Sequence, residues 1–133
     1  MYLTKDELTT HLRVESITAI TRDDPTLAES AIDGAISEAK GYLTRYDTNA
    51  IFNTIGEERN ALLLIFVKDI AAWHLVNIVN PNIDLKLREK RYDRAIEWLK
   101  GVQKALIEPS LPVAPEKDPS LTHFGSTPNK SDW

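Results

Sequence analysis

The side chains best suited to chemistry are three histidines and several carboxylates. Their spacing along the sequence matches no catalytic or metal-binding pattern. His11, His74 and His123 lie in separate segments of the 133-residue chain, so no two of them have the spacing of metal ligands. Asp69 and His74 are five residues apart, which suits them poorly to sharing one helix face. The chain has no cysteine, which excludes disulfides, zinc–thiolate sites and thiol nucleophiles. We therefore predict no catalytic residue, no metal site and no bound cofactor.

The carboxylate pairs have a structural explanation. Asp23-Asp24 and Glu57-Glu58 each lie at the start of an expected helix, where the helix macrodipole favours acidic side chains. No glycine-rich phosphate loop, GxSxG or HExxH pattern occurs. An enzyme would need a polar pocket with perturbed carboxylates, for which the sequence gives no sign. We therefore expect a protein that is not an enzyme.

One apolar segment dominates the chain. Residues 61–79 are hydrophobic on nearly every side, which is typical of a helix covered by neighbours on more than one face. We expect this helix to span about residues 57–79. A membrane span is the rival interpretation. However, Lys68 and Asp69 lie at mid-length, and burying their charges at the centre of a bilayer would cost much free energy. The sequence favours a central helix in a globular domain without membrane contact.

Asp69 needs a partner in that setting. A buried carboxylate is unfavourable without a positive charge or hydrogen-bond donors beside it. Arginines on the flanking helices are the natural candidates. We predict an ion pair or hydrogen bond to Asp69 from Arg91 or Arg45, with a structural rather than a catalytic role.

Two short helices are expected at the N-terminus. Thr4 and Glu7 have the spacing of a capping box, and a helix to about Leu12 follows them. Apolar side chains recur every third residue over residues 14–20, which indicates a second short helix.

Two longer helices complete the predicted domain. One starts near Leu27 and carries an amphipathic stripe rich in alanine, which favours close approach to a neighbour. The other spans about residues 84–106, with apolar side chains along one side. The sequence thus predicts an all-α fold, a compact bundle of four to five helices over residues 1–106 around the central helix.

The segment between the two middle helices is expected to be a loop, Asp47–Gly56. It carries three bulky apolar residues, Ile51, Phe52 and Ile55, for which a solvated loop has no need. They either fold back onto the core, which we favour, or form an adhesive surface. All three remain candidate contacts with a partner or a neighbouring subunit.

A basic strip is predicted on the last helix. Lys86, Lys90 and Arg94 are spaced by four residues and therefore line one side of it. The strip is either a solvated face or a contact surface for an acidic partner or for nearby DNA. The chain has 16 Lys and Arg against 20 Asp and Glu, and this net charge of −4 argues against nucleic acid as the main partner.

Residues 107–133 form a distinct tail that contains five of the seven prolines. We expect an extended chain without helical or strand periodicity. Apolar residues are spaced along it, and we take Phe124 and Trp133 as candidate contacts. The tail is either inert and disordered, or an arm that lies on its own domain or on a neighbouring subunit.

Four segments, in matching order, resemble a known family. They are Met1–Thr4, Gly41–Tyr46, Asp69–Ala71 and, most strongly, Arg91–Gly101, whose sequence RYDRAIEWLKG is similar to an RYxxAxxWLxxI-type last helix. The family comprises small Mu-like phage proteins of the head–tail connector, or adaptor, group. The resemblance covers about residues 1–106.

The resemblance implies a compact all-α fold and a structural role in the virion. It also implies a ring of subunits that docks beneath the portal protein of a filled capsid and offers a surface to tail-completion proteins. Adaptors often form rings only on their portal, so a monomer in isolation fits this role. The family supplies no catalytic or cofactor-binding residue. This chain departs from its pattern in the 47–56 loop, which lacks the expected prolines, and in its longer tail.

The alternative is a small helical nucleic-acid-binding protein of a phage packaging machine, which would use the basic strip. For the connector, DNA contact would be only incidental. The N-terminus lacks the basic-then-apolar pattern of a signal peptide, so we expect assembly in the cytoplasm of the host. Residence in the virion is what the family resemblance implies.

Overall fold

The computed structural model describes residues 1–22, 24, 26–78 and 85–114, and within these ranges the fold is all-α, as predicted. The α-helices are α1 (Val14–Thr21), α2 (Leu27–Tyr42), α3 (Thr48–Phe52), α4 (Ala61–Ile78) and α5 (Leu85–Gln103). Two 3-10 helices, η1 (Lys5–Thr10) and η2 (Gly56–Glu58), complete the described elements. An isolated bridge joins Tyr46 to Val113.

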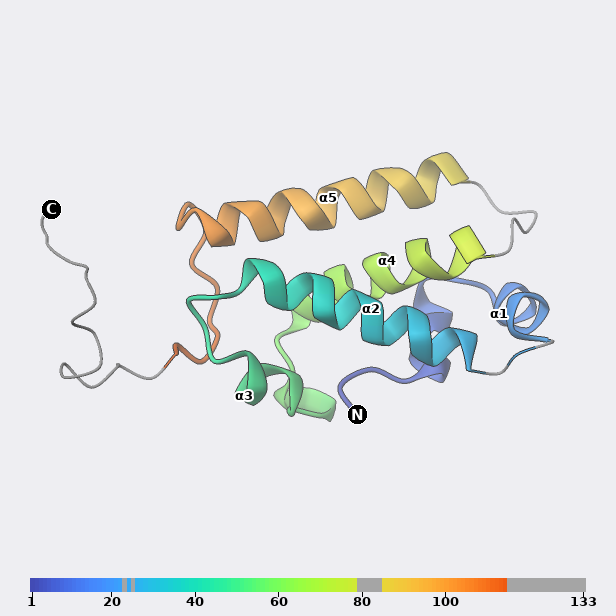
Figure 1. The fold of residues 1–133 in the computed structure, drawn as a ribbon, viewed down its shortest axis with the longest axis horizontal. Helices are drawn as coiled ribbons and strands as arrows, with labels where there is room; N and C mark the ends of the chain where they lie inside the picture. Colours follow the sequence, from blue (N-terminus) through green and yellow to red (C-terminus); the bar gives the residue numbers. More distant parts are fainter. Residues whose placement is uncertain (23, 25, 79–84, 115–133) are drawn as a thin grey trace, which may run out of the picture.

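The helix α4 lies at the centre of the bundle, packed against both α2 and α5 (Figure 1). Its inward side chains are fully buried, among them Leu63, Val67 and Ile70. The alanine stripe of α2, with Ala35 and Ala39 fully buried, provides the close approach that small side chains allow. This arrangement confirms the predicted central position of the apolar segment.

The structure corrects where α4 begins. The helix starts at Ala61 rather than near Glu57, because Asn60 caps it: the Asn60 Oδ1 accepts a hydrogen bond from the Leu63 N–H at 3.0 Å. Glu57 and Glu58 belong to the separate turn η2. Asparagine at an N-cap satisfies a donor that would otherwise lack a partner, and this local signal decides the boundary.

The first helix expected from the capping box is the 3-10 helix η1. The Glu7 carboxylate accepts a hydrogen bond from the Thr4 N–H at 3.1 Å, as the spacing predicts. Leu8 and Leu12 are buried, and so are the two residues that precede the cap, Tyr2 and Leu3. The N-terminus is therefore an integral part of the core.

The helix α5 ends in a tight turn. The Leu106 and Ile107 N–H groups donate to the Gly101 carbonyl at 2.9 and 3.2 Å, and Ala105 adopts a positive φ of 61°. A methyl group at Gly101 would lie 2.7 Å from Ile107 Cδ1, so glycine lets Ile107 fold back against the helix. This turn leaves Leu106 79% exposed, although the apolar side chains earlier in α5, such as Leu99 and Val102, are buried.

The described part of the tail, residues 107–114, lies on its own domain. The Asp47 N–H donates to the Pro112 carbonyl at 2.9 Å, and the Ala114 N–H donates to the Arg45 carbonyl at 3.1 Å. Ile107 and Leu111 are partly buried against the core. One of the two proposed behaviours of the arm is thus observed for these eight residues.

Candidate interaction surfaces

The segment predicted as a loop is partly helical. Asp47 caps α3 through its Oδ1, which accepts a hydrogen bond from the Ala50 N–H at 3.1 Å. The cap makes a single helical turn favourable in a segment with too few residues to show a clear period. This short helix decides which way the apolar side chains of the segment point.

Two of the three apolar contact candidates in this segment point inward. Ile51 and Phe52 are 3% and 8% exposed, and the Phe52 ring packs edge-on against the Tyr2 ring with 4.8 Å between their centres. They fold back onto the core, which is the alternative that the sequence favoured, and they are therefore not available as contacts for a partner. Ile55 is 60% exposed and stays a candidate.

The basic strip lies on the exposed side of α5, as the spacing predicts. Lys86, Lys90 and Arg94 are all exposed. Arg94 differs from the two lysines because its Nη2 lies 3.4 Å from the Asp69 Oδ2 and its guanidinium lies 5.5 Å from the centre of the Phe66 ring. One of the three cations is therefore partly neutralised by α4.

Asp69 is buried and paired, but with different partners from those predicted. Its side chain is fully buried, with His11 Nε2 at 3.2 Å from Oδ1 and Arg94 Nη2 at 3.4 Å from Oδ2. Among the described residues, Oδ1 has this His11 nitrogen close by but no well-aligned hydrogen bond. The expected pairing with Arg91 or Arg45 is wrong, because the end of η1 covers this side of α4.

Arg45 and Arg91 have other surroundings. The Arg45 Nη2 donates to the Val102 carbonyl at 2.6 Å, and its guanidinium lies 5.4 Å from the centre of the Tyr46 ring. Arg91 is half-buried on α5. The Val102 carbonyl lies at the C-terminal end of α5, where a cation is favourable.

Two further cations fasten η1 onto the bundle. The buried Arg88 donates to the His11 carbonyl at 2.8 Å, and the Lys68 Nζ donates to the Thr10 hydroxyl at 3.2 Å. The sequence gives no local signal for these contacts, since they join segments that are distant along the chain. The group around Asp69 therefore holds η1, α4 and α5 together.

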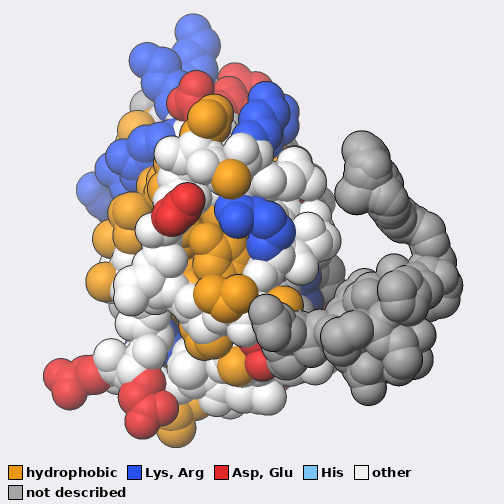
Figure 2. All heavy atoms as spheres, turned by 90° about the vertical axis from the view of Figure 1, so that its left-hand side faces the viewer, with side chains coloured by type: hydrophobic (Ala, Val, Ile, Leu, Met, Phe, Trp, Pro, Cys, Tyr) orange, Lys and Arg blue, Asp and Glu red, His pale blue; other side chains and the backbone are white. Residues whose placement is uncertain are grey.

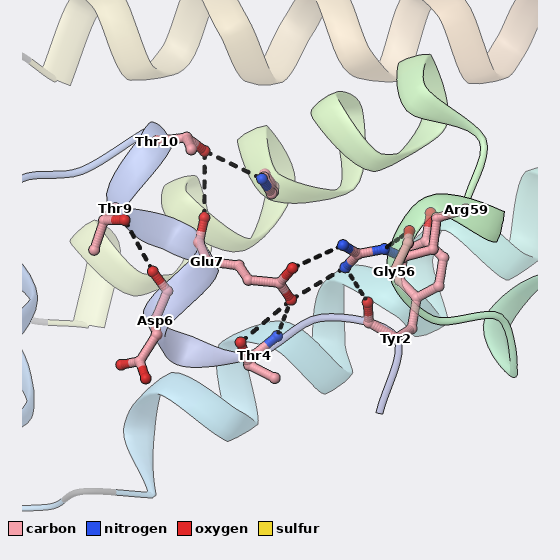
Figure 3. A network of polar contacts seen from close by, with 9 residues as sticks. Tyr2, Thr4, Asp6, Glu7, Thr9, Thr10, Gly56 and Arg59 are labelled. Carbon is pink, nitrogen blue, oxygen red and sulfur yellow. Dashed lines mark hydrogen bonds and ion pairs between the residues drawn. The ribbon is translucent and has the colours of Figure 1, made fainter.

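A second polar network joins the N-terminus to η2 (Figure 3). Arg59 contacts the Glu7 carboxylate at 2.8 Å through Nη2, and it donates to the Tyr2 carbonyl at 2.8 Å and to the Gly56 carbonyl at 2.9 Å. The hydrogen bond from Arg59 lowers the pKa of Glu7 to about 2, helped by the Thr4 N–H. Burial raises the pKa of Tyr2 to about 12, against the opposing charge of Arg59. The capping-box pattern explained Glu7 but gave no hint of Arg59.

A third network joins α2, α4 and α5. The His74 Nε2 lies 2.8 Å from the Glu38 Oε1, and the Tyr92 hydroxyl donates to the other oxygen of Glu38. The Tyr92 ring stacks on Trp73 with 5.8 Å between ring centres. Burial, and then Glu38, raise the pKa of Tyr92 well above its usual range. One ring nitrogen of His74 thus has a polar partner within the bundle.

A shallow groove of about 600 Å³ follows the C-terminal half of α5. Its lining combines charged side chains, including Asp93, Glu97 and Lys100, with the apolar Leu106 and Ile107. Small-molecule sites are usually more enclosed than this open groove. Figure 2 shows hydrophobic side chains at the surface of the same end of the bundle.

Two negative findings apply to the described ranges alone. There, no group of three or more His, Asp or Glu side chains is arranged to hold a metal ion. Within the same ranges, no helix combines the length and the hydrophobicity needed to cross a bilayer. Phe124 and Trp133, the contact candidates in the tail, lie outside the described residues.

Comparison with known families adds the deciding observation. The family model described as Bacteriophage Mu, Gp36 matches residues 2–125. The chain belongs to the Mu Gp36 family. Comparisons with curated proteins and with solved structures gave no match.

The Gp36 match agrees with the resemblance noted in the sequence and extends it beyond residue 106 into the tail. It confirms a Mu-like phage protein. The segments that carried the resemblance are largely structural in this Gp36-family chain: Tyr2, Leu3 and Asp69 are buried, and Ala95 and Leu99 lie in the core.

Proposed function

We propose that this Gp36-family chain is a structural head–tail connector, an adaptor that forms a ring between the portal and the tail. The observation that carries the proposal is the Mu Gp36 match over residues 2–125. The four matching segments and the all-α fold support it. In this role the chain is not an enzyme, and its working parts are surfaces rather than a pocket.

The proposed partners are the portal protein, tail-completion proteins and neighbouring copies in the ring. The exposed Ile55, the strip of Lys86, Lys90 and Arg94, and the tail are the surfaces that we assign to these contacts. The protein would be made and assembled in the host cytoplasm and would remain in the virion, with no membrane contact and only incidental contact with DNA.

The test is co-assembly with the cognate portal. Purified chain and portal are mixed, and ring formation on the portal is followed by electron microscopy and by mass in solution. The connector role predicts a portal complex with several copies of the chain. Failure to co-assemble would contradict it, as would normal tail attachment in a phage that lacks the gene.

The alternative is a nucleic-acid-binding protein of the packaging machine, favoured only by the exposed basic strip. Against it stand the net charge of −4 and the engagement of Arg94 with Asp69. Double-stranded DNA binding that weakens steeply with salt and is lost in Lys86→Glu/Lys90→Glu would support it. No binding at low salt would exclude it.

A further inference from the structure

The N-terminal half of α4 has an uncovered apolar face. The helix is hydrophobic on all sides, yet Leu62 and Ile65 are 45% and 41% exposed. Further along α4, the same side is covered by η1 and by the residue after it: Thr10 contacts Lys68, and His11 contacts Asp69. A helix that is apolar all round is normally buried all round, so this exposed part is a place for another surface.

The face has a cationic border on α5. Arg94 crosses from α5 to α4, where its guanidinium stands over Phe66, and its side chain keeps 57% of its surface exposed. Lys90 is exposed one turn before it. The half-buried Trp98 packs against Phe66 with 5.2 Å between ring centres. Tryptophan and arginine are the residue types that most often dominate protein–protein contacts.

The opposite border is acidic. Glu57 and Glu58 are exposed on η2, next to Ile55, which is 60% exposed. Figure 3 views the molecule from this side and shows α5, α4 and η2 following one another. At its left-hand edge, Figure 2 shows cationic, hydrophobic and acidic side chains in that order from top to bottom.

This order makes the face complementary to itself. A two-fold rotation about an axis through the apolar middle exchanges its two borders. With the axis roughly along α4, it brings the cations of each copy to the carboxylates of the other and places α4 of one copy against α4 of the other, running in roughly the same direction. We propose that two copies of this chain associate through this face, with Leu62 and Ile65 at the centre of the contact.

A second copy is the occupant that the charges favour. A uniformly basic border would fit any acidic partner, whereas this face carries both signs, placed so that one rotation pairs them. Its apolar centre is small, which places the contact among weak, transient interfaces that bury less than about 1,200 Å². The inference does not depend on the connector role, because ring neighbours use two different surfaces and this contact uses the same surface twice.

The first experiment measures mass against concentration for the full chain by sedimentation at low salt. We expect a monomer–dimer equilibrium that shifts to monomer as salt rises. Leu62→Glu/Ile65→Glu should weaken the dimer at least about tenfold. The matched control is Val14→Glu/Leu106→Glu, which alters two exposed apolar residues elsewhere and should leave the dimer unchanged. A monomer at every concentration, or equal weakening by the control, overturns the proposal.

The second experiment exchanges charges. Glu57→Lys/Glu58→Lys and Lys90→Glu/Arg94→Glu should each remain monomeric alone, and mixing them should restore a dimer that contains one chain of each. Restoration separates a lost contact from a damaged fold, which matters because Arg94 also contacts Asp69. Two variants that both fold, by circular dichroism, and do not pair when mixed would contradict the two-fold arrangement. The dimer test and the portal test are independent. Co-assembly with the portal neither supports nor contradicts the pairing of the two charge-exchanged variants.

Discussion

At the scale of single residues, the described part of the molecule depends on two charged side chains that serve more than one element. Asp69 binds His11 of the N-terminal segment and Arg94 of α5, and Arg59 binds the N-terminus from the turn before α4. The sequence predicted that Asp69 would be buried and paired, because its neighbours in a helix are apolar. It could not predict the partner, since His11 is brought there by tertiary packing and has no spacing relation to Asp69.

His11→Ala should destabilise the fold by about 1–3 kcal/mol, because it leaves a fully buried carboxylate with Arg94 as its one remaining partner among the described residues. Urea unfolding measures the change. Adding Asp69→Asn to this variant should recover part of the loss, because an unpaired amide is less costly to bury than a charge. Lys90→Ala is the control and should stay within about 0.5 kcal/mol of the parent chain. A His11→Ala variant as stable as the parent would disprove the role given to this pair.

Glu7 should make stability depend on acid pH. Its pKa in the folded state is lowered to about 2, below that of an unfolded glutamate. Its contribution is therefore complete above about pH 4.5 and disappears as the pH falls towards 2. We expect about 1 kcal/mol, since the pair is partly exposed and solvent screens it. Unfolding of the parent chain and of Glu7→Gln across pH 2–6 should show a constant difference above pH 5 that closes on acidification.

At the scale of elements, hydrophobic periodicity predicted which segments are long helices. Capping side chains determined where helices begin. The stripes of α2 and α5 predicted helices that the structure contains. The beginning of α4 depends on Asn60 and the existence of α3 on Asp47, and both are single side chains within otherwise uninformative segments. Hydrophobicity alone also suggested that Ile51, Phe52 and Ile55 would behave alike, whereas the one-turn helix separates them into two buried residues and one exposed residue.

Ala105→Gly should stabilise the C-terminal turn of α5. Ala105 has a φ of 61°, which glycine adopts without the steric cost that a β-carbon brings. We expect a gain of about 0.5–1 kcal/mol in the free energy of unfolding. Gln103→Gly, two residues earlier and within the helix, should instead cost a similar amount. Equal effects of the two substitutions would contradict this reading of the turn.

At the scale of the whole molecule, the segment after α5 packs against the middle of the chain. Residues 107–114 lie beside the segment that joins α2 to α3, and their backbone bonds to Arg45 and Asp47 fix them there. The sequence placed the domain boundary near residue 106 from the proline content. The structure shows that the described residues beyond this point are still attached to the domain.

Truncation should measure this attachment. A chain that ends at residue 107 should be less stable than one that ends at residue 114, by about 1–2 kcal/mol, because it loses two backbone hydrogen bonds and the packing of Leu111. Thermal or urea unfolding of both truncations gives the difference. If they are equally stable, the contacts of the tail contribute nothing to the fold.

The positive charge of Arg94 is available to a partner only if the contact between Arg94 and Asp69 is broken. Any partner that draws the guanidinium away from α4 must also compensate Asp69, so binding at the strip and the internal order of α4 are thermodynamically linked. A ligand that replaces Asp69 as the partner of Arg94 would loosen the contact between α4 and α5. Amide hydrogen exchange in α4 would then accelerate. A ligand that engages only Lys86 and Lys90 would bind without that cost.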